Sequence, residues 1–439
     1  MFKFISITLQ IILILVLTLI VINNSFIISF EINDFLYSIS SSYIFLIFLV
    51  FFLLIFLLQT FYFKTKFNFS KYRVSKMIKN KEKGYHAFVN GMIALSNKDY
   101  KKAILESKKI SNYLDGNPSL SLLLKSEVFK VEKKYDELHT IYEKMIKNYN
   151  TENLGYRGLM EQYLRSQDYH HAFLYGEKLF NKNPFIEKIY ETLVNIIAKT
   201  NNWQQLIVIT EKALSKKVID KREYQENKSI GFFEIAKIKQ FSEPHESINL
   251  IQKAIKLRRN FSPYVKLYIE LMIQNKKYAE AKKYIKKVWS ETAHSEYKVL
   301  IQKLATHLNT SFSDLAKYVV GSSYSNEESK ILLIEASIHD KKWPEARSQI
   351  KDLLDVKPKK QICLLMAKIE EGDSNDIQKM DAWTLRAKNG DPSNLWICGI
   401  THKSQDEWAS LSEAGYFNSL VWQQPTMLNQ IQISKDYEN

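Results

Sequence analysis

The sequence predicts an all-α protein with three parts: a two-helix transmembrane hairpin, an α-solenoid of repeated helical hairpins, and a small tryptophan-rich module of irregular or β structure. Residues 43–63 are almost wholly apolar over the thickness of a membrane. Aromatic residues then recur about every 34 positions, which is the mark of a repeat architecture. Only 12 glycines and 8 prolines occur in 439 residues, which favours helices over many-stranded sandwiches or barrels.

Two apolar segments predict membrane-spanning helices at about residues 4–22 and 43–63. The second has 21 residues, and a helix of that length covers about 30 Å, the thickness of a bilayer core. The first is too long for the apolar region of a typical signal peptide and no small-residue cleavage site follows it, so we expect it to be retained. Neither segment contains a charged residue, which indicates an anchor rather than an ion path.

Charge predicts the orientation of this hairpin. The connecting residues 23–42 contain Glu31 and Asp34 but no Lys or Arg, whereas Lys3 precedes the first span. Eight cations follow the second span: Lys64, Lys66, Lys71, Arg73, Lys76, Lys79, Lys81 and Lys83. The positive-inside rule therefore places both ends of the chain in the cytoplasm. At an anionic membrane surface each such cation contributes about 1 kcal/mol.

From Gly84 onward the sequence predicts stacked helical hairpins. In each hairpin an aromatic residue plugs the corner, and a small or apolar residue three positions later opens the second helix. These pairs are Tyr100 with Ala103, Tyr135 with Leu138, Tyr169 with Ala172, Trp203 with Leu206, Tyr278 with Ala281, and Trp343 with Ala346. We expect one longer extra unit around residues 232–257 and a loss of phase with a loop between 306 and 328. The predicted domains are 1–83, 84–375, 376–426 and a disordered tail, 427–439.

The C-terminal module contains three tryptophans, Trp396, Trp408 and Trp422. Its spacing resembles a zinc-ribbon or rubredoxin-like knuckle. On that frame the four ligand positions hold Cys398, Thr401, Leu411 and Ala414. A tetrahedral metal site needs four donors, so no metal is predicted. The module is then either a degenerate ribbon held by its tryptophans, or the match to the frame is a coincidence.

The sequence supports no catalytic residue and no cofactor. It lacks the glycine-rich phosphate and dinucleotide motifs, the nucleophile elbow and the zinc-protease motif. The net charge is +15, but the lysines are spread along helices, so nucleic acid is not an expected partner. The pair His170-His171, at the start of a second helix, is a candidate for haem ligation; a surface pair is the default interpretation.

The hairpins resemble the tetratricopeptide repeat (TPR), since Gly91 falls at the helix-A glycine and four alanines match the helix-B alanine. The two spans, the basic segment, the repeats and the W-x-C…EW…G-x-F…W…P tail together resemble the membrane-anchored HemY TPR family of proteobacteria. This resemblance implies a location in the bacterial inner membrane and a role in late protohaem synthesis. It does not extend to the flavin-dependent protoporphyrinogen oxidase of the same name, whose glycine fingerprint is absent.

The leading hypothesis is thus a non-enzymatic scaffold whose concave face binds protein partners, among them haem-pathway enzymes. Candidate lining residues are Tyr85, Asn90, Tyr156, Gln162 and Tyr190. Two alternatives remain open. One is an adaptor in envelope biogenesis, because the lipopolysaccharide assembly protein B has a related architecture with one anchor and an intact knuckle. The other is a porphyrin carrier on the same scaffold.

Overall fold

The computed structural model describes residues 2–23, 26–32, 35–114, 116–354 and 358–425. The predicted disordered tail at 427–439 lies outside these residues. The chain divides into two compact units, Met1–Lys134 and Tyr135–Asn439, which we describe separately. The described residues are mostly helical, and the helices form TPR-like hairpins followed by a small C-terminal sheet.

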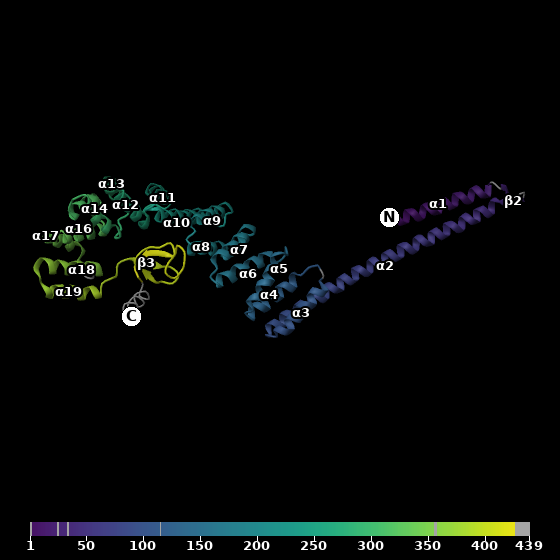
Figure 1. The fold of residues 1–439 in the computed structure, drawn as a ribbon, viewed down its shortest axis with the longest axis horizontal. Coiled ribbons are helices and arrows are strands. Elements are labelled where there is room, and N and C mark those ends of the chain that lie inside the picture. Colours follow the sequence, from purple (N-terminus) through teal and green to yellow (C-terminus); the bar gives the residue numbers. More distant parts are fainter. Residues whose placement is uncertain (1, 24–25, 33–34, 115, 355–357, 426–439) are drawn as a thin grey trace. The chain divides into compact units, whose positions relative to one another are not determined.

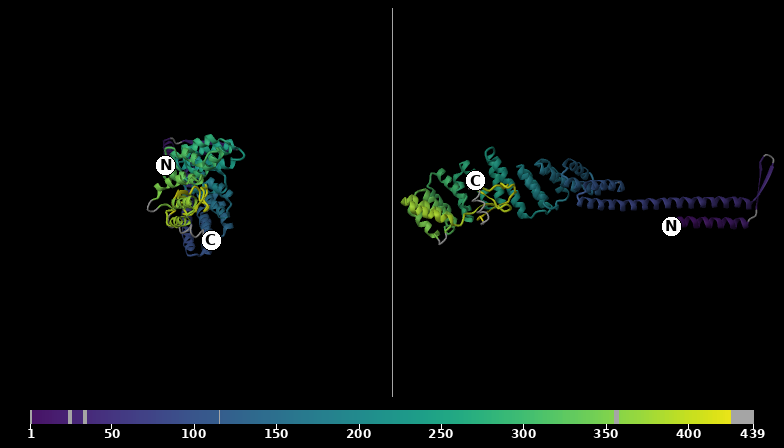
Figure 2. Two further views of the ribbon diagram at one scale, coloured as in Figure 1. Left: turned by 90° about the vertical axis from the view of Figure 1, so that its left-hand side faces the viewer. Right: turned by 90° about the horizontal axis from the view of Figure 1, so that it is seen from below.

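Unit 1 begins with a helix, a β-hairpin and a very long helix. Its elements are α1 (Phe2–Asn23), β1 (Ile27–Ile32), β2 (Phe35–Ser40), α2 (Ser41–Ser96), α3 (Tyr100–Tyr113) and α4 (Ser119–Val131). Helix α1 runs back alongside α2 (Figure 2), and the side-chain amide of Gln10 donates to Oε1 of Gln59 over 3.0 Å.

The segment between the two apolar helices is ordered where the sequence analysis expected only a connecting loop. Strands β1 and β2 pair in antiparallel register, from Ile27 opposite Ser40 to Ile32 opposite Phe35. β-branched and aromatic residues dominate both strands, and such residues favour extended backbone. This pattern is short, with six residues in each strand, and two much longer apolar helices flank it.

Helix α2 continues without a break from the apolar segment through the basic segment into the first hairpin. Its 56 residues correspond to about 84 Å of helix. The predicted boundary at 83/84 therefore falls inside α2. Beyond it, Gly84, Ala87, Gly91 and Ala94 are buried, and the helix packs against α3 and α4.

Unit 2 consists of successive antiparallel helices and a three-stranded sheet (Figure 1). The helices are α5 (Tyr135–Ile146), α6 (Glu152–Arg165), α7 (Tyr169–Lys182), α8 (Ile189–Lys199), α9 (Trp203–Ser215), α10 (Lys221–Lys239), α11 (Pro244–Leu257), α12 (Ser262–Gln274), α13 (Tyr278–Glu291), α14 (Tyr297–His307), α15 (Phe312–Val320), α16 (Glu327–His339), α17 (Trp343–Ile350), α18 (Lys360–Ile369) and α19 (Ile377–Lys388). The strands are β3 (Leu395–Cys398), β4 (Ser404–Gln405) and β5 (Leu420–Gln423).

The repeat pattern read from the sequence is confirmed at its corners. Each of the six aromatic residues is the first residue of a helix, opening α3, α5, α7, α9, α13 and α17. The paired alanines are fully buried, so the two helices of a hairpin approach closely there. The residue two positions before each aromatic has a positive φ, between 53° and 61°: Lys98, Lys133, Gln167, Asn201, Lys276 and Lys341. This left-handed residue ends one helix and turns the chain into the next.

The two irregular stretches also form hairpins. The longer unit is α10 and α11, and the stretch between 306 and 328 forms the end of α14 and the short helix α15. The expected loss of phase is thus a shorter hairpin, in which Gly321, at φ +50°, ends α15. Helix α19 belongs with α18, so the first part of the predicted 376–426 module is helical and its strands begin at Leu395.

Candidate partner-binding surface

The C-terminal module packs onto the first helices of three hairpins in unit 2. We call this surface the first-helix face; it is formed by α8, α10 and α12. The module is an antiparallel sheet in the order β4-β3-β5. Trp408 is 8% exposed and its ring lies 5.5 Å from that of Phe233, 5.1 Å from Phe261 and 6.3 Å from Tyr264, in edge-to-face geometry. Trp408 is therefore the central apolar anchor of the module.

Polar contacts fix the module around this anchor. Nε1 of Trp396 donates to Oε1 of Glu296 over 3.0 Å, and the backbone N–H of Phe417 donates to Oδ1 of Asn195 over 3.0 Å. At the edge, Nζ of Lys266 lies 3.2 Å from a carboxylate oxygen of Glu407. These contacts join residues at least 100 positions apart, so the module is an integral part of unit 2.

His294 forms a titratable contact between the solenoid and the module. Its ring lies 4.7 Å from the ring of Trp422, and its Nδ1 lies 3.7 Å from Glu296. Burial lowers the pKa of His294; Glu296 opposes this shift, while Lys266 and Lys298 add to it. The neutral imidazole is thus the form that suits the docked module.

The module therefore covers the first-helix face along α8, α10 and α12, where first-helix residues were expected to bind partners. Tryptophan spacing predicted a module held by its own tryptophans, but nothing in the sequence marked Phe233, Phe261 and Tyr264 as the rings on which Trp408 packs. The pairing is a long-range contact between residues of ordinary helix-core type. Only the folded chain brings them to one place.

The five predicted lining residues lie in different local settings. Tyr190 is 4% exposed; it lies in the core, where its hydroxyl accepts from Nδ2 of Asn227 over 3.0 Å, and burial raises its pKa to about 12. Tyr156 is half-buried, and Gln162 uses its amide to reach the backbone carbonyl of Tyr135 over 2.7 Å. Tyr85 and Asn90 lie exposed on α2 in unit 1.

His170 and His171 are exposed at the start of α7. Asp168 is the N-cap of this helix: it accepts from the backbone N–H of His171 and its other oxygen lies 2.7 Å from Nδ1 of the same ring. These contacts lower the pKa of Asp168. The His171 ring also stacks on Tyr163 at 5.0 Å. The arrangement is that of a helix cap, and haem ligation by this pair stays a prediction.

Of the four ligand positions of the zinc-ribbon frame, only Cys398 carries a thiol. Sγ of Cys398 lies 3.3 Å from Oγ of Ser419 and 3.9 Å from Oγ of Ser412, which places the second half of the frame beside the first. Burial raises the pKa of this thiol, but hydrogen bonds, that of Ser419 first, outweigh burial and bring it to about 6. Within the part of the chain that the structure describes, no three His, Cys, Asp or Glu residues group as metal ligands.

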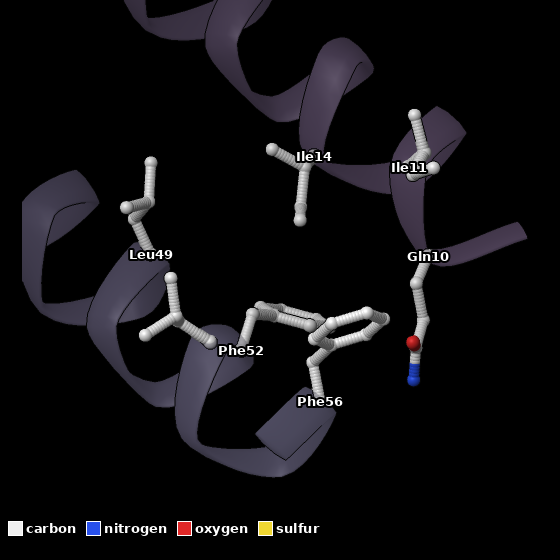
Figure 3. A pocket seen from close by; sticks show the side chains of 7 residues that line it. Gln10, Ile11, Ile14, Leu49, Phe52 and Phe56 are labelled. Atoms are coloured by element: carbon white, nitrogen blue, oxygen red, sulfur yellow. The ribbon is translucent and has the colours of Figure 1, made fainter. Parts of the chain in front are cut away.

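Among the described residues, α2 is the one helix long and apolar enough to cross a membrane; Thr8–Ile20 of α1 is a shorter apolar stretch. Between these helices lies a hollow of about 310 Å³. Figure 3 shows Ile14 of α1 facing Leu49, Phe52 and Phe56 of α2 across this space. Apart from Gln10, the residues that line it are apolar.

Comparison with known proteins finds one curated relative over part of the chain. No family model matches it. It is 23% identical over 173 residues to a probable magnetosome protein, Mms48, of Magnetospirillum gryphiswaldense, and the match covers 38% of each chain. The resemblance to the HemY family therefore stays a prediction.

Solved structures are similar to this chain only at low identity and low TM-score. A TPR protein from Parabacteroides merdae is 14% identical, covering 56% of this chain and 92% of that one, with a TM-score of 0.27. The Naa15/Naa10 complex bound to HypK-THB contains a chain that is 14% identical, with 71% and 50% covered and a TM-score of 0.42. The TPR2AB domain of yeast Sti1, in complex with pHSP90, is 11% identical, with 70% and 98% covered and a TM-score of 0.29. The assignment of a TPR-like solenoid rests on this chain's own hairpins.

Proposed function

We propose that this chain is a membrane-anchored TPR adaptor that binds protein partners and catalyses no reaction itself. The observation that carries the proposal is α2, a single helix that begins in a membrane-length apolar segment and ends as the first helix of a TPR-like hairpin. A solenoid tied to a membrane in this way presents long helical surfaces to proteins at that membrane. Two of the solved structures compared above, Naa15/Naa10 bound to HypK-THB and the TPR2AB domain of Sti1 with pHSP90, are complexes.

The finer part of the proposal is a two-span hairpin with both ends in the cytoplasm. The antiparallel packing of α1 on α2 and the Gln10–Gln59 hydrogen bond support it. Cysteine labelling with a membrane-impermeant maleimide tests it. Tyr37→Cys, in the connection between the helices, should be labelled from outside intact cells, and Lys98→Cys should be labelled only after lysis. Labelling of both from one side would contradict the hairpin.

The most specific part of the proposal is a role in late protohaem synthesis, and it rests on the resemblance to the HemY family alone. A pull-down from solubilised membranes tests it together with the adaptor role. Reproducible recovery of ferrochelatase or a protoporphyrinogen oxidase supports the haem role. Recovery of other defined proteins supports an adaptor outside this pathway, and recovery of none contradicts the adaptor role.

A further inference from the structure

An exposed apolar stripe lies along one side of α2 in unit 1. Ile78, Tyr85 and Met92 are seven residues apart, so they share one side of the helix, and Val89 and Ile93 lie beside them. These five side chains are between 41% and 62% exposed. Single exposed apolar residues are ordinary on protein surfaces, but a stripe of this length marks an interaction surface.

The position of the stripe explains why it is open. The opposite side of the same helix is packed: Ala87 and Ala94 are buried, and Gly91 contacts Leu124 of α4. The stripe thus occupies the side on which a preceding hairpin would stack in a longer solenoid. Terminal repeats usually carry a polar outer face there, and this one does not.

A hollow flanks the stripe. It measures about 500 Å³ and lies between α2 and the turn from α3 to α4, lined by Met77, Tyr85, Tyr113, Leu114 and Leu120 among others. A cavity of this size accepts one or two large side chains. The surface therefore combines an apolar ridge with a place for an anchor residue from a partner.

The positive charge beside the stripe favours an acidic partner. Lys79 and Lys81 lie on α2 on either side of the stripe, and among the described residues neither forms an ion pair, whereas lysines elsewhere do, such as Lys182 with Glu152 at 2.8 Å. Two copies of α2 side by side would bring these like charges together, which disfavours a homodimer here. An acidic partner would neutralise them.

The membrane is a less suitable occupant than a protein. Phe67 and Val74, both exposed, continue the apolar side of α2 toward the membrane. Ile78 lies 15 residues beyond Phe63, the end of the apolar segment, which is roughly 22 Å of helix. The part of the stripe from Ile78 to Met92 is therefore out of reach of the hydrocarbon while α2 continues as one helix.

We propose that this stripe of α2 docks an amphipathic helix of a partner protein, whose apolar face is flanked by Asp and Glu residues. Ile78, Tyr85 and Met92 pack against the apolar face, the hollow beside Tyr85 receives one large side chain, and the lysines pair with the flanking carboxylates. This inference rests on the proposed adaptor function and names the surface and partner class for it.

Two designed helical peptides test the proposal on the full-length chain in nanodiscs of zwitterionic lipid. Both have the same leucine stripe; one is flanked by Glu and the other by Lys. Fluorescence anisotropy should show binding of the Glu-flanked peptide, at least tenfold weaker binding of the Lys-flanked peptide, and weakening by added salt. Equal binding of both peptides, or of neither, would overturn the proposal.

Variants locate the binding surface. Ile78→Ser with Met92→Ser should weaken binding at least tenfold, while Leu105→Ser, at an exposed apolar residue of α3, should leave it unchanged. Far-ultraviolet circular dichroism confirms that each variant is folded. A photo-crosslinker in place of Tyr85 distinguishes occupants in native membranes: a product with another protein supports the proposal, and a product of twice the chain mass overturns it. If pull-downs succeed but these variants bind as wild type, only this inference fails.

Discussion

Trp408→Ala should release the C-terminal module from the first-helix face. The indole is 8% exposed and packs edge-to-face on Phe233, Phe261 and Tyr264. Burial of roughly 200 Å² of a tryptophan at about 25 cal/mol per Å² gives about 5 kcal/mol as an upper bound. Core tryptophan-to-alanine changes cost about 3–5 kcal/mol, so most of the docking free energy should be lost.

Limited proteolysis of the full-length protein in detergent measures the effect. In the variant, cleavage within residues 391–425 should be faster by at least tenfold, while the helical hairpins should keep their circular dichroism. Trp383→Ala is the matched control, because this half-buried tryptophan packs in the separate cluster of the last hairpins. Equal proteolysis of wild type and the Trp408 variant would refute the argument that the indole anchors the module.

Three further predictions concern single contacts. Burial lowers the pKa of His294 below the value of about 6.5 that the side chain has in the unfolded chain, so protonation favours the undocked state. Lowering the pH from 7.5 to 5.5 should therefore weaken docking of the module. His294→Gln should remove this pH dependence in the same proteolysis assay. Arg347→Ala should lower the free energy of unfolding by about 1–3 kcal/mol, because Glu370, 4% exposed, loses two hydrogen bonds of 2.7 and 3.0 Å. Since Arg347 lowers the pKa of Glu370, that difference should shrink in urea titrations as the pH falls below about 4.3. Gly91→Ala should lower the melting temperature despite the better helix propensity of alanine, because the added Cβ would collide with Leu124; an unchanged or higher melting temperature would contradict that close approach.

Much of the fold was predictable because repeats are local. The corner pattern spans only a few residues: a turn, an aromatic residue, and a small residue three positions later. Tyr100, Tyr169 and Tyr278 therefore each marked a helix start correctly. The short pattern of β1 and β2 was missed because two long apolar helices flank it. The hairpin α14–α15 was missed because its second helix has only nine residues.

The candidate surfaces were predicted less well than the fold. Tyr190 was taken for a lining residue, yet a helix-A tyrosine can equally turn inward, and here it completes a buried network with Thr210 and Asn227. Tyr85 is exposed on α2, and its role in partner binding stays a prediction. Helical periodicity alone does not say which side of a helix the neighbouring hairpin covers.

The sequence by itself determined the helical class, the apolar helix at 43–63 with its basic continuation, and the positions of the hairpin corners, because each depends on residues close together in the chain. Only the tertiary structure decided what the first-helix face does. It brought Trp408 to Phe233 and Tyr264 across more than 140 residues, covered the expected binding face with the chain's own module, and left the outer side of α2 bare. Such pairings follow from the shape of the stacked hairpins and from packing between distant residues, which no local pattern encodes.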